Sequence, residues 1–318
     1  MPALTSPIAR RLEVCLHRWP RPLARDLRQY LAAAPGWPQS RPRDGAGRYQ
    51  EHCWLLLPRW LFARYRRAPA QPRPEFLGDV LWGQYCLFLF VRIHDDVFDG
   101  HATQASLVFA ADALLVESER AFARHFDAGS FWSLFRGYLD TSLRAIVEVD
   151  ARQRGPNGMR RADLALYARV SAIFKTGAAA VCVRCRRLAD LPSVERFIDG
   201  VAVATQILDD LVDTTDDLRR GRLNVAAAAL FRHRAGSGAG RAQLVRQVAR
   251  RARVEAALDR LFAEAATHLQ RARAAADALG LVEASHYAES FERSLVKLDD
   301  RLHRSRVKDL LGRKKLSR

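Results

Sequence analysis

Residues 80–100 read VLWGQYCLFLFVRIHDDVFDG, a long apolar run that ends in three aspartates within five residues. Its apolar side chains recur at spacings of three and four and cover most of the circumference that a helix would have, which is typical of an interior helix. Residues 159–188 and 193–219 have the same character. We therefore predict three inner helices, the first of which ends in the aspartates.

The rest of the chain continues the helical pattern. No stretch shows the alternating, β-branched pattern that strands require, and proline or glycine clusters separate the apolar segments. We predict an all-α fold, a single-domain bundle of about ten or more helices over residues 1–318, with a basic C-terminal tail at 301–318. The expected helices span 6–33, 47–67, 75–99, 103–126, 130–153, 159–188, 193–219, 222–233, 240–279 and 281–311.

The composition narrows the class of protein. The chain has 318 residues, of which 49% are hydrophobic and 27% charged, and this balance excludes a collagen, an acidic disordered tail and a membrane bundle. The charge-free window at 80–91 is far shorter than the roughly 20 residues that span a bilayer. The N-terminus lacks the apolar stretch of a secretory signal, and five scattered cysteines agree with a reducing compartment. We expect a cytoplasmic protein.

The charge balance favours anionic partners. Lysine and arginine total 52 against 35 acidic residues, a net charge of +17. Lys175 is the only lysine in the first 296 residues, and a compact point charge where arginine is the rule suggests a specific role. The basic runs lack interleaved aromatic residues, so we expect no specific nucleic-acid binding. A weak contact of the tail at 301–318 with an anionic membrane surface, and a homodimer, stay open.

Two aspartate clusters interrupt the apolar helices. They consist of Asp95, Asp96 and Asp99, and of Asp209, Asp210, Asp213, Asp216 and Asp217. Residues four apart share one face of a helix, where like charges repel, and the C-terminal end of a helix disfavours negative charge further. Compensation can come from arginine, from solvent at the helix ends, or from divalent cations. Oxygen ligands without His or Cys at ligand spacing suit Mg²⁺.

These motifs resemble those of the class I isoprenoid synthases. DDVFD at 95–99 matches their DDxxD motif, and QILDDLVDTTDD at 206–217 is similar to the second aspartate-rich motif of trans-prenyltransferases. YARVSAIFKTGAAA at 167–180 resembles the helix whose Lys-Thr pair contacts diphosphate. The likeness covers roughly residues 80–225. It implies a helical bundle around a central apolar cavity, with the two motifs facing each other across its mouth and a prenyl diphosphate held between them by three Mg²⁺ ions.

The resemblance implies a role for each matching residue. The catalytic residues would be Asp95, Asp99, Asp209 and Lys175. The metal ligands would be Asp95, Asp96, Asp99, Asp209, Asp213 and Asp217. The diphosphate contacts would be Lys175, Thr176, Gln206, Arg219, Arg220 and Arg222. The cavity wall below the aspartates would include Tyr85, Phe88, Phe90, Val91, Ser171, Ala202 and Thr205, although each of these is also typical of core packing.

The implied chemistry needs such an arrangement. Ionising an allylic diphosphate separates a carbocation from a multiply charged anion, so cations must stabilise the charge that develops on the leaving group. Water would quench the carbocation, so the cavity must be dry, and aromatic ring faces can stabilise the cation.

One departure from the trans-prenyltransferases decides which reaction we expect. Those enzymes bind a second diphosphate with an arginine pair after DDxxD and a GGKxxR element. Here no arginine follows Asp99 until Arg120, and SRPRDGAGRYQEH at 40–52 is only a faint echo of the second element. We therefore expect a Mg²⁺-dependent terpene synthase that ionises one linear prenyl diphosphate and directs cyclisation or elimination.

Three alternatives stay open. The first is a trans-prenyltransferase that extends its substrate with isopentenyl diphosphate. The second is a condensing enzyme of the squalene or phytoene synthase type, suggested by TDDLRRGRLN at 215–224. The third is a basic helical scaffold without catalytic activity, whose aspartates pair with arginine.

Overall fold

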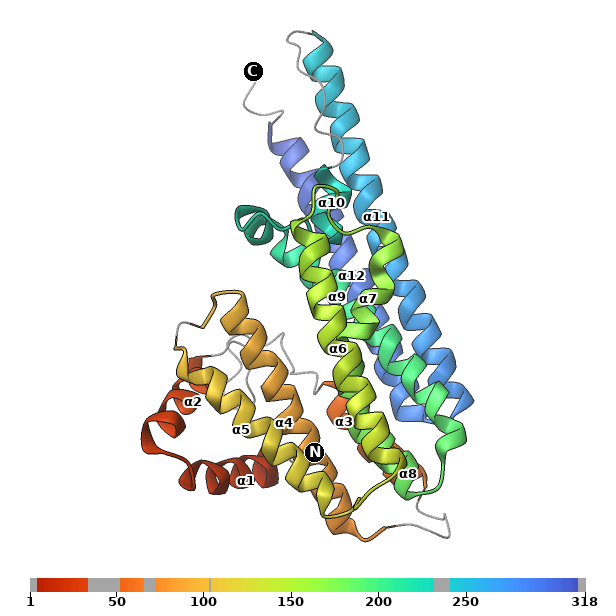
Figure 1. Cartoon of the computed structure of the whole chain (residues 1–318). Helices are drawn as coiled ribbons and strands as arrows, with labels where there is room; N and C mark the ends of the chain where they lie inside the picture. Colours follow the sequence, from red (N-terminus) through yellow and green to blue (C-terminus); the bar gives the residue numbers. More distant parts are fainter. Residues whose placement is uncertain (1–4, 34–51, 66–71, 103, 232–240, 314–318) are drawn as a thin grey trace. The chain divides into compact units, whose positions relative to one another are not determined.

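The computed structural model describes residues 5–33, 52–65, 72–102, 104–231 and 241–313. Every regular element within these ranges is helical, and they contain twelve α-helices (Figure 1). The predicted all-α fold is therefore confirmed. The arginine- and glycine-containing stretch at 40–51 and the side chains of the basic tail at 301–318 lie outside the described residues.

The chain forms two compact units. The first consists of Met1–Tyr138 and Ile173–Leu191, and the second of Leu139–Ala172 and Pro192–Arg318. The chain passes between them three times, so each unit combines segments that are distant in sequence. The single domain expected over residues 1–318 stays a prediction.

The first unit is built around α4. Its helices are α1 (Thr5–His17), α2 (Arg21–Ala33), α3 (Cys53–Arg64), α4 (Pro74–Phe98), α5 (Ser106–Ala123) and α8 (Thr176–Arg184). Side chains of α1, α2, α4 and α5 share one hydrophobic core, while α3 and α8 contact α4 and each other. Almost every side chain of α4 between Phe76 and Leu89 is buried, which explains why this stretch is apolar around its whole circumference.

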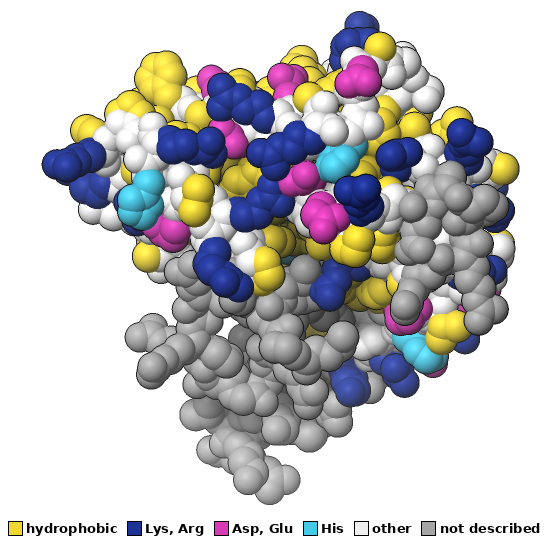
Figure 2. All heavy atoms as spheres, turned by 90° about the horizontal axis from the view of Figure 1, so that it is seen from below, with side chains coloured by type: hydrophobic (Ala, Val, Ile, Leu, Met, Phe, Trp, Pro, Cys, Tyr) yellow, Lys and Arg dark blue, Asp and Glu magenta, His cyan; other side chains and the backbone are white. Residues whose placement is uncertain are grey.

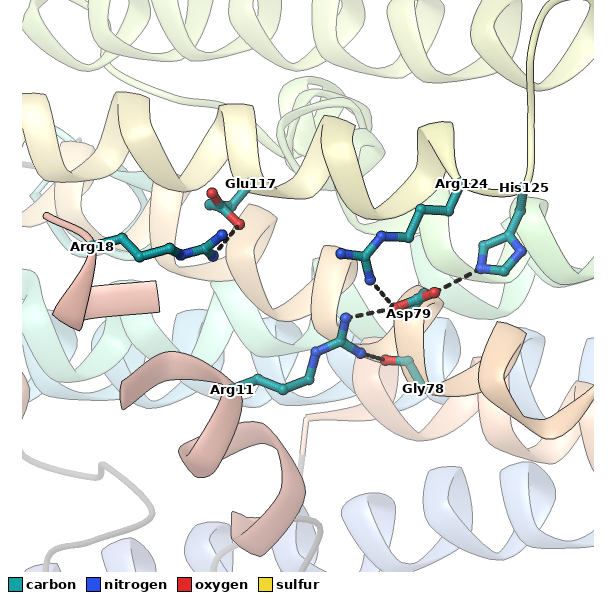
Figure 3. A network of polar contacts seen from close by, with 7 residues as sticks. All are labelled: Arg11, Arg18, Gly78, Asp79, Glu117, Arg124 and His125. Atoms are coloured by element: carbon teal, nitrogen blue, oxygen red, sulfur yellow. Dashed lines mark hydrogen bonds and ion pairs between the residues drawn. The ribbon is translucent and has the colours of Figure 1, made fainter. Parts of the chain in front are cut away.

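A polar network fastens α1 to α4 and α5 (Figure 3). Asp79 near the start of α4 forms ion pairs with Arg11 of α1 and with Arg124, 3.0 Å away, after α5. His125 contacts the other carboxylate oxygen at 2.8 Å. Burial opposes ionisation here, but the bonds from Arg11 and His125 hold the pKa of Asp79 below its ordinary value. The carboxylate therefore stays charged and ties three segments together.

The single helix expected over 6–33 is wrong, because the structure contains two helices there. Proline lacks the N–H that a continuous helix needs, and it disfavours the helical conformation of the residue before it. α1 accordingly ends at His17, and α2 begins directly after Pro20, whose carbonyl accepts the Ala24 N–H at 3.1 Å.

The single helix expected over 159–188 is also wrong. A 3₁₀ turn at Arg161–Asp163, α7 (Leu164–Val170), a second 3₁₀ turn at Ser171–Lys175 and α8 replace it. At the second break the Thr176 hydroxyl donates to the carbonyl of Ile173 at 2.7 Å, and the Gly177 N–H donates to Oε1 of Gln84 on α4 at 2.6 Å. A Cβ on Gly177 would lie 2.8 Å from that oxygen, so glycine permits the close approach of α8 to α4.

The second unit contains the remaining helices. They are α6 (Ser130–Arg154), which begins in the first unit, α7, α9 (Leu191–Arg219), α10 (Val225–Phe231), α11 (Arg241–Ala278) and α12 (Val282–Arg313). The long helices α11 and α12 pack against each other. α9 approaches α11 closely at Gly200, where a Cβ would lie 2.5 Å from the carbonyl oxygen of His268.

Acidic side chains lie among the basic ones on the surface. Figure 2 shows a face on which lysine and arginine side chains alternate with acidic and hydrophobic ones. On α6, Arg144 pairs with Asp140 and Arg154 with Asp150 one helical turn away, each at 2.8 Å. Such exposed pairs contribute about 0 to 1 kcal/mol each and are typical of solvated helix faces.

Among the described residues, two segments are long and apolar enough to cross a membrane by length and composition alone. They are Pro74–Phe98 and Arg161–Arg184. About two thirds of the most apolar window of each is buried inside the protein, as in the core helices of soluble proteins. A cytoplasmic location stays a prediction.

Candidate functional site

The first aspartate motif lies at the end of α4, in the first unit. Asp99 follows the last helical residue, its N–H donates to the carbonyl of Asp95 at 2.8 Å, and Gly100 turns the chain with a φ of +70°. The side chain of Asp95 is 58% exposed. The surrounding protein removes part of the water around Asp95, and this desolvation raises its pKa to about 6. The like charge of Asp99 adds to the rise. A cation beside this pair would relieve the repulsion.

Asp96 has a different environment, although it is adjacent in sequence. It is buried, and its carboxylate accepts a hydrogen bond from the Tyr30 hydroxyl of α2 and forms an ion pair with Arg92 at 3.0 Å. Its carbonyl accepts the N–H groups of His101 and Ala102 at 2.8 and 2.9 Å. Asp96 therefore anchors the turn after α4 to α2. The alternative of arginine pairing, raised for the whole motif, applies best to this residue.

The predicted Lys-Thr pair lies at the break between the 3₁₀ turn and α8, also in the first unit. The side chains of Lys175 and Thr176 are both buried. Because the Thr176 hydroxyl donates to the Ile173 carbonyl, its hydrogen atom is used within the turn. The break replaces the straight helix that the sequence predicts with a bend at the lysine.

Aromatic rings from three segments meet in the first unit. Trp54 of α3 stacks on Phe174 with ring centroids 4.9 Å apart, and Phe88 of α4 lies 6.2 Å from Phe174. His52 stacks on Trp54 at 5.0 Å and lies 4.9 Å from Phe88. Phe88 is the only one of these four that sequence analysis selected. Phe174 had a signal in its position next to Lys175, whereas the other two come from a segment without a motif.

The other wall residues predicted on α4 have separate surroundings. Tyr85 belongs to the core that α4 shares with α1 and α2, where it lies 6.1 Å from Trp82. Phe90 packs edge-on against His94 at 4.7 Å, and Val91 is partly buried one turn before Asp95. We call the rings of His52, Trp54, Phe88 and Phe174 the aromatic layer. Of the wall residues predicted on α4, only Phe88 belongs to it.

The second aspartate motif lies on α9, in the second unit. Asp209 and Asp213 are exposed, and Asp217 is partly buried, so the three side chains predicted to share a face differ in accessibility. The side chain of Asp216 lies outside the described residues. Within the described part of the chain, no group of three or more His, Cys, Asp or Glu side chains is placed to hold a metal ion.

Asp210 is the buried member of this motif. Its carboxylate accepts hydrogen bonds from the Tyr167 hydroxyl of α7, from Nε2 of Gln206 at 3.1 Å and from the N–H of Val225 at 3.0 Å. Burial raises its pKa to about 7 against these bonds, which lower it, and the charge of Asp217 adds to the rise. Asp210 therefore ties α9 to α7 and to the start of α10.

Asn224 completes the network, and sequence analysis did not select it. Its side-chain amide donates to Oδ2 of Asp217 at 2.7 Å and to the carbonyl of Asp210 at 3.0 Å. Its amide oxygen accepts the N–H of Ala227 at 2.7 Å, which caps α10. The only sequence signal was its position directly after the GRL triplet at 221–223.

The remaining predicted residues of the second unit are dispersed. Arg219 and Arg220 are exposed, whereas Arg222 is buried and lies 3.7 Å from Asp150 of α6. Ala202 is buried, and the Thr205 hydroxyl donates to the carbonyl of Val201 at 2.9 Å. Ser171, at the start of the 3₁₀ turn, is partly buried.

Known structures share this fold. No family model matches the sequence, and no curated protein matches it either. The structure is similar to that of a decaprenyl diphosphate synthase from Rhodobacter capsulatus, with a TM-score of 0.65 and 14% identity over 92% of this chain and 96% of that one. A geranylgeranyl pyrophosphate synthetase from the archaeon Geoglobus acetivorans gives 0.62 and 15% over 91% and 96%. A polyprenyl synthase from Roseobacter denitrificans gives 0.61 and 17% over 91% and 97%.

These similarities define the class of fold. The chain has the class I isoprenoid synthase fold, as its motifs had indicated. Since the identities are low, the likeness concerns the fold, and the activity must be argued from the site.

Proposed function

We propose that the chain is an enzyme that ionises a linear prenyl diphosphate. The observation that carries this proposal is the pair of carboxylates at the end of α4, where Asp95 and Asp99 follow a buried apolar helix and the pKa of Asp95 is raised to about 6. Divalent cations held by these carboxylates would offset the repulsion between Asp95 and Asp99 and would supply positive charge to a diphosphate. The isoprenoid synthase fold supports the substrate class.

The chemistry of the ligands fits Mg²⁺, because every candidate is a carboxylate oxygen. In the first unit, Asp95 and Asp99 would hold it, and we propose that Asp96 supports them as the anchor of the turn. When bound, Mg²⁺ supplies charge stabilisation to the leaving diphosphate. Among the described residues no three such side chains converge, so diphosphate oxygens and water would have to supply the other ligands.

In the second unit, we propose that Asp209, Asp213 and Asp217 on α9 are also metal ligands. The resemblance implies three ions in total. Asp209 and Asp213 are exposed on α9.

The positive charges would neutralise the diphosphate. We propose this role for Lys175, which is buried and follows Phe174 in the sequence, and for the exposed Arg219 and Arg220. Three other predicted contacts are engaged within the protein, so we assign them no direct contact with the diphosphate. They are Thr176 at the Ile173 carbonyl, Gln206 at Asp210 and Arg222 near Asp150.

The aromatic layer suits the step after ionisation, in which a carbocation must be stabilised. Phe88 and Phe174 would stabilise a carbocation by cation–π interaction, worth about 2 kcal/mol or more in a dry site, whereas Trp54 is stacked against both His52 and Phe174. Phe88 lies two helical turns before Asp95, so the Phe88 ring and the Asp95 carboxylate belong to the same side of α4.

Two reactions remain candidates for the fate of the carbocation. The solved structures favour chain elongation, since the similar proteins are prenyl diphosphate synthases, and this alternative is better supported than the terpene synthase that the sequence led us to expect. The absence of arginine between Asp99 and Arg120 favours cyclisation or elimination of a single substrate. We propose the elongation reaction first and the single-substrate reaction second.

Product analysis tests the proposal. The protein is incubated with allylic diphosphates of 10, 15 and 20 carbons and Mg²⁺, with and without isopentenyl diphosphate, and both released diphosphate and the organic products are measured. Products longer by five carbons, formed only with both substrates, would support elongation. Hydrocarbon or alcohol products from one substrate would support the second reaction. No release of diphosphate under any of these conditions would overturn the proposal in favour of a non-enzymatic scaffold.

A further inference from the structure

Asn224 occupies an unusual place between two carboxylate-bearing turns of α9. Its side chain is fully buried, and each of its polar atoms makes a hydrogen bond within the second unit. One amide hydrogen goes to the side chain of Asp217 and the other to the backbone of Asp210, while the oxygen caps α10. One side chain thus joins the end of α9, the following loop and the start of α10.

The bond to Asp217 has a consequence that the other two lack. Asp217 lies eight residues after Asp209 on the same side of α9. The neutral amide of Asn224 donates to Oδ2 of Asp217 at 2.7 Å, which fixes the direction of the carboxylate without bringing a charge of its own.

We propose that Asn224 is a positioning residue that holds Asp217 in the orientation in which it binds a divalent cation. This inference rests on the proposed function, which supplies the cation and the diphosphate. It assigns a purpose to a residue outside the aspartate motif, and to the hydrogen bond that connects the motif with α10. Partners of this kind typically change metal affinity by about 10- to 100-fold when removed.

A matched pair of variants isolates this bond. Asn224→Ser retains an oxygen that can cap α10 but is too short to donate to Asp217. Thr214→Val is the control, because the Thr214 hydroxyl donates to the same Asp210 carbonyl at 2.6 Å in a contact that does not involve Asp217. Binding of Mn²⁺ to the full chain in the presence of inorganic diphosphate is measured by electron paramagnetic resonance, so the readout does not depend on turnover.

We expect Asn224→Ser to weaken Mn²⁺ binding about tenfold and Thr214→Val to change it less than about twofold. Equal affinities in both variants would overturn the inference and leave Asn224 with a structural role only. If the wild-type chain binds no Mn²⁺ with diphosphate, the proposed function itself fails, so the two failures are distinguishable.

An exchange of the two partners provides the second test, in case Asn224→Ser folds poorly. Asn224→Asp alone would place two carboxylates at hydrogen-bond distance and should lower the melting temperature. Adding Asp217→Asn restores a hydrogen bond of reversed direction. We expect the double variant to recover only part of the melting temperature, because the bond to the Asp210 carbonyl stays lost, and to bind Mn²⁺ as weakly as Asp217→Asn alone. Recovery of Mn²⁺ affinity together with stability would contradict the role of Asp217 as a ligand, and the inference with it.

Discussion

The two aspartate motifs are built on the same plan from unrelated helices. In the first motif, on α4, the second aspartate of the pair is buried and accepts a hydrogen bond from a tyrosine of another helix. Asp96 is bonded to Tyr30 of α2, and Arg92, one turn earlier on α4, pairs with its other oxygen. The neighbouring Asp95 remains accessible.

The second motif, on α9, repeats each of these parts. Asp210 is buried, accepts the hydroxyl of Tyr167 from α7, and is bonded to Gln206 one turn earlier. The neighbouring Asp209 is exposed. In both motifs, one aspartate of the pair is therefore buried and holds helices together, and the other is exposed.

The difference lies in the residue one turn earlier. Arg92 brings a positive charge to Asp96, whereas Gln206 is neutral and Asp210 has a pKa raised to about 7. The first motif thus compensates its buried charge with a guanidinium, and the second compensates it with hydrogen bonds and a shifted protonation equilibrium. Adjacent aspartates in a sequence motif can have opposite tasks, and burial separates them.

The largest expected effect comes from the exposed aspartates, Asp95 and Asp209, which we expect diphosphate release to require. We expect Asp95→Ala or Asp209→Ala to abolish diphosphate release while the melting temperature without metal is kept or rises, because removing a repelling carboxylate does not destabilise the apo protein. Asp140→Ala, which removes an exposed carboxylate of α6, is the control and should keep full activity. Turnover retained in both variants would point to arginine pairing instead.

The next largest effect should come from the cation near the first motif. We expect Lys175→Ala to lower kcat/KM at least about tenfold, because a charge-assisted contact to the leaving group is worth roughly 1.5 to 3 kcal/mol. Lys175→Arg should recover part of the loss, since a planar fork does not replace a compact charge. Lys297→Ala, on the exposed side of α12, is the control. Wild-type kinetics for Lys175→Ala would place the lysine outside the site.

The two tyrosines test whether both motifs depend on the same kind of hydrogen bond to a buried aspartate. We expect Tyr30→Phe and Tyr167→Phe each to lower the free energy of unfolding by about 1 to 3 kcal/mol, since each leaves a buried carboxylate with one donor fewer. Urea denaturation monitored by circular dichroism measures both. A variant that unfolds at the wild-type urea concentration would show that its motif does not depend on the tyrosine anchor.

A change of pH tests the buried aspartate of the second motif. The pKa of Asp210 is about 7 in the folded chain and about 3.9 for an unperturbed carboxyl, so the folded state binds more protons between these values. The free energy of unfolding should therefore fall as the pH rises from about 4 to 7, and Asp210→Asn should reduce that slope. An unchanged slope in Asp210→Asn would place the titration elsewhere, with Asp95 as the next candidate.

The sequence predicted the helices that carry the motifs well. The expected 75–99 and 193–219 compare with α4 at Pro74–Phe98 and α9 at Leu191–Arg219, because long apolar periodicity with flanking breakers is a local signal. The break between α1 and α2 also has a local signal, which is Pro20, but the prediction of one helix over 6–33 did not use it. The break before α8 was not, since it depends on Gln84, 93 residues before Gly177 in the sequence.

The candidate site was predictable only in part, for the same reason. Aspartate spacing marks the accessible carboxylates, but it does not tell that Asp96 and Asp210 are buried. Their tyrosine partners lie 66 and 43 residues away in the sequence. Tyr30 lies outside every motif, and Tyr167 opens the stretch at 167–180 but had no role in that resemblance. Asn224 lies beyond the motif and reaches it only because the chain turns back at Gly221, where φ is +73°.

The most direct test asks whether both motifs serve one ionisation step. Diphosphate release from a single allylic diphosphate, in Mg²⁺ and after its removal by EDTA, is measured for the wild-type chain, Asp95→Asn, Asp209→Asn and the double variant. We predict Mg²⁺-dependent release by the wild-type chain, a large loss in each single variant, and no further loss in the double variant, because residues that act as a unit are not additive. Release that persists in EDTA, or single variants with wild-type rates, would contradict the account.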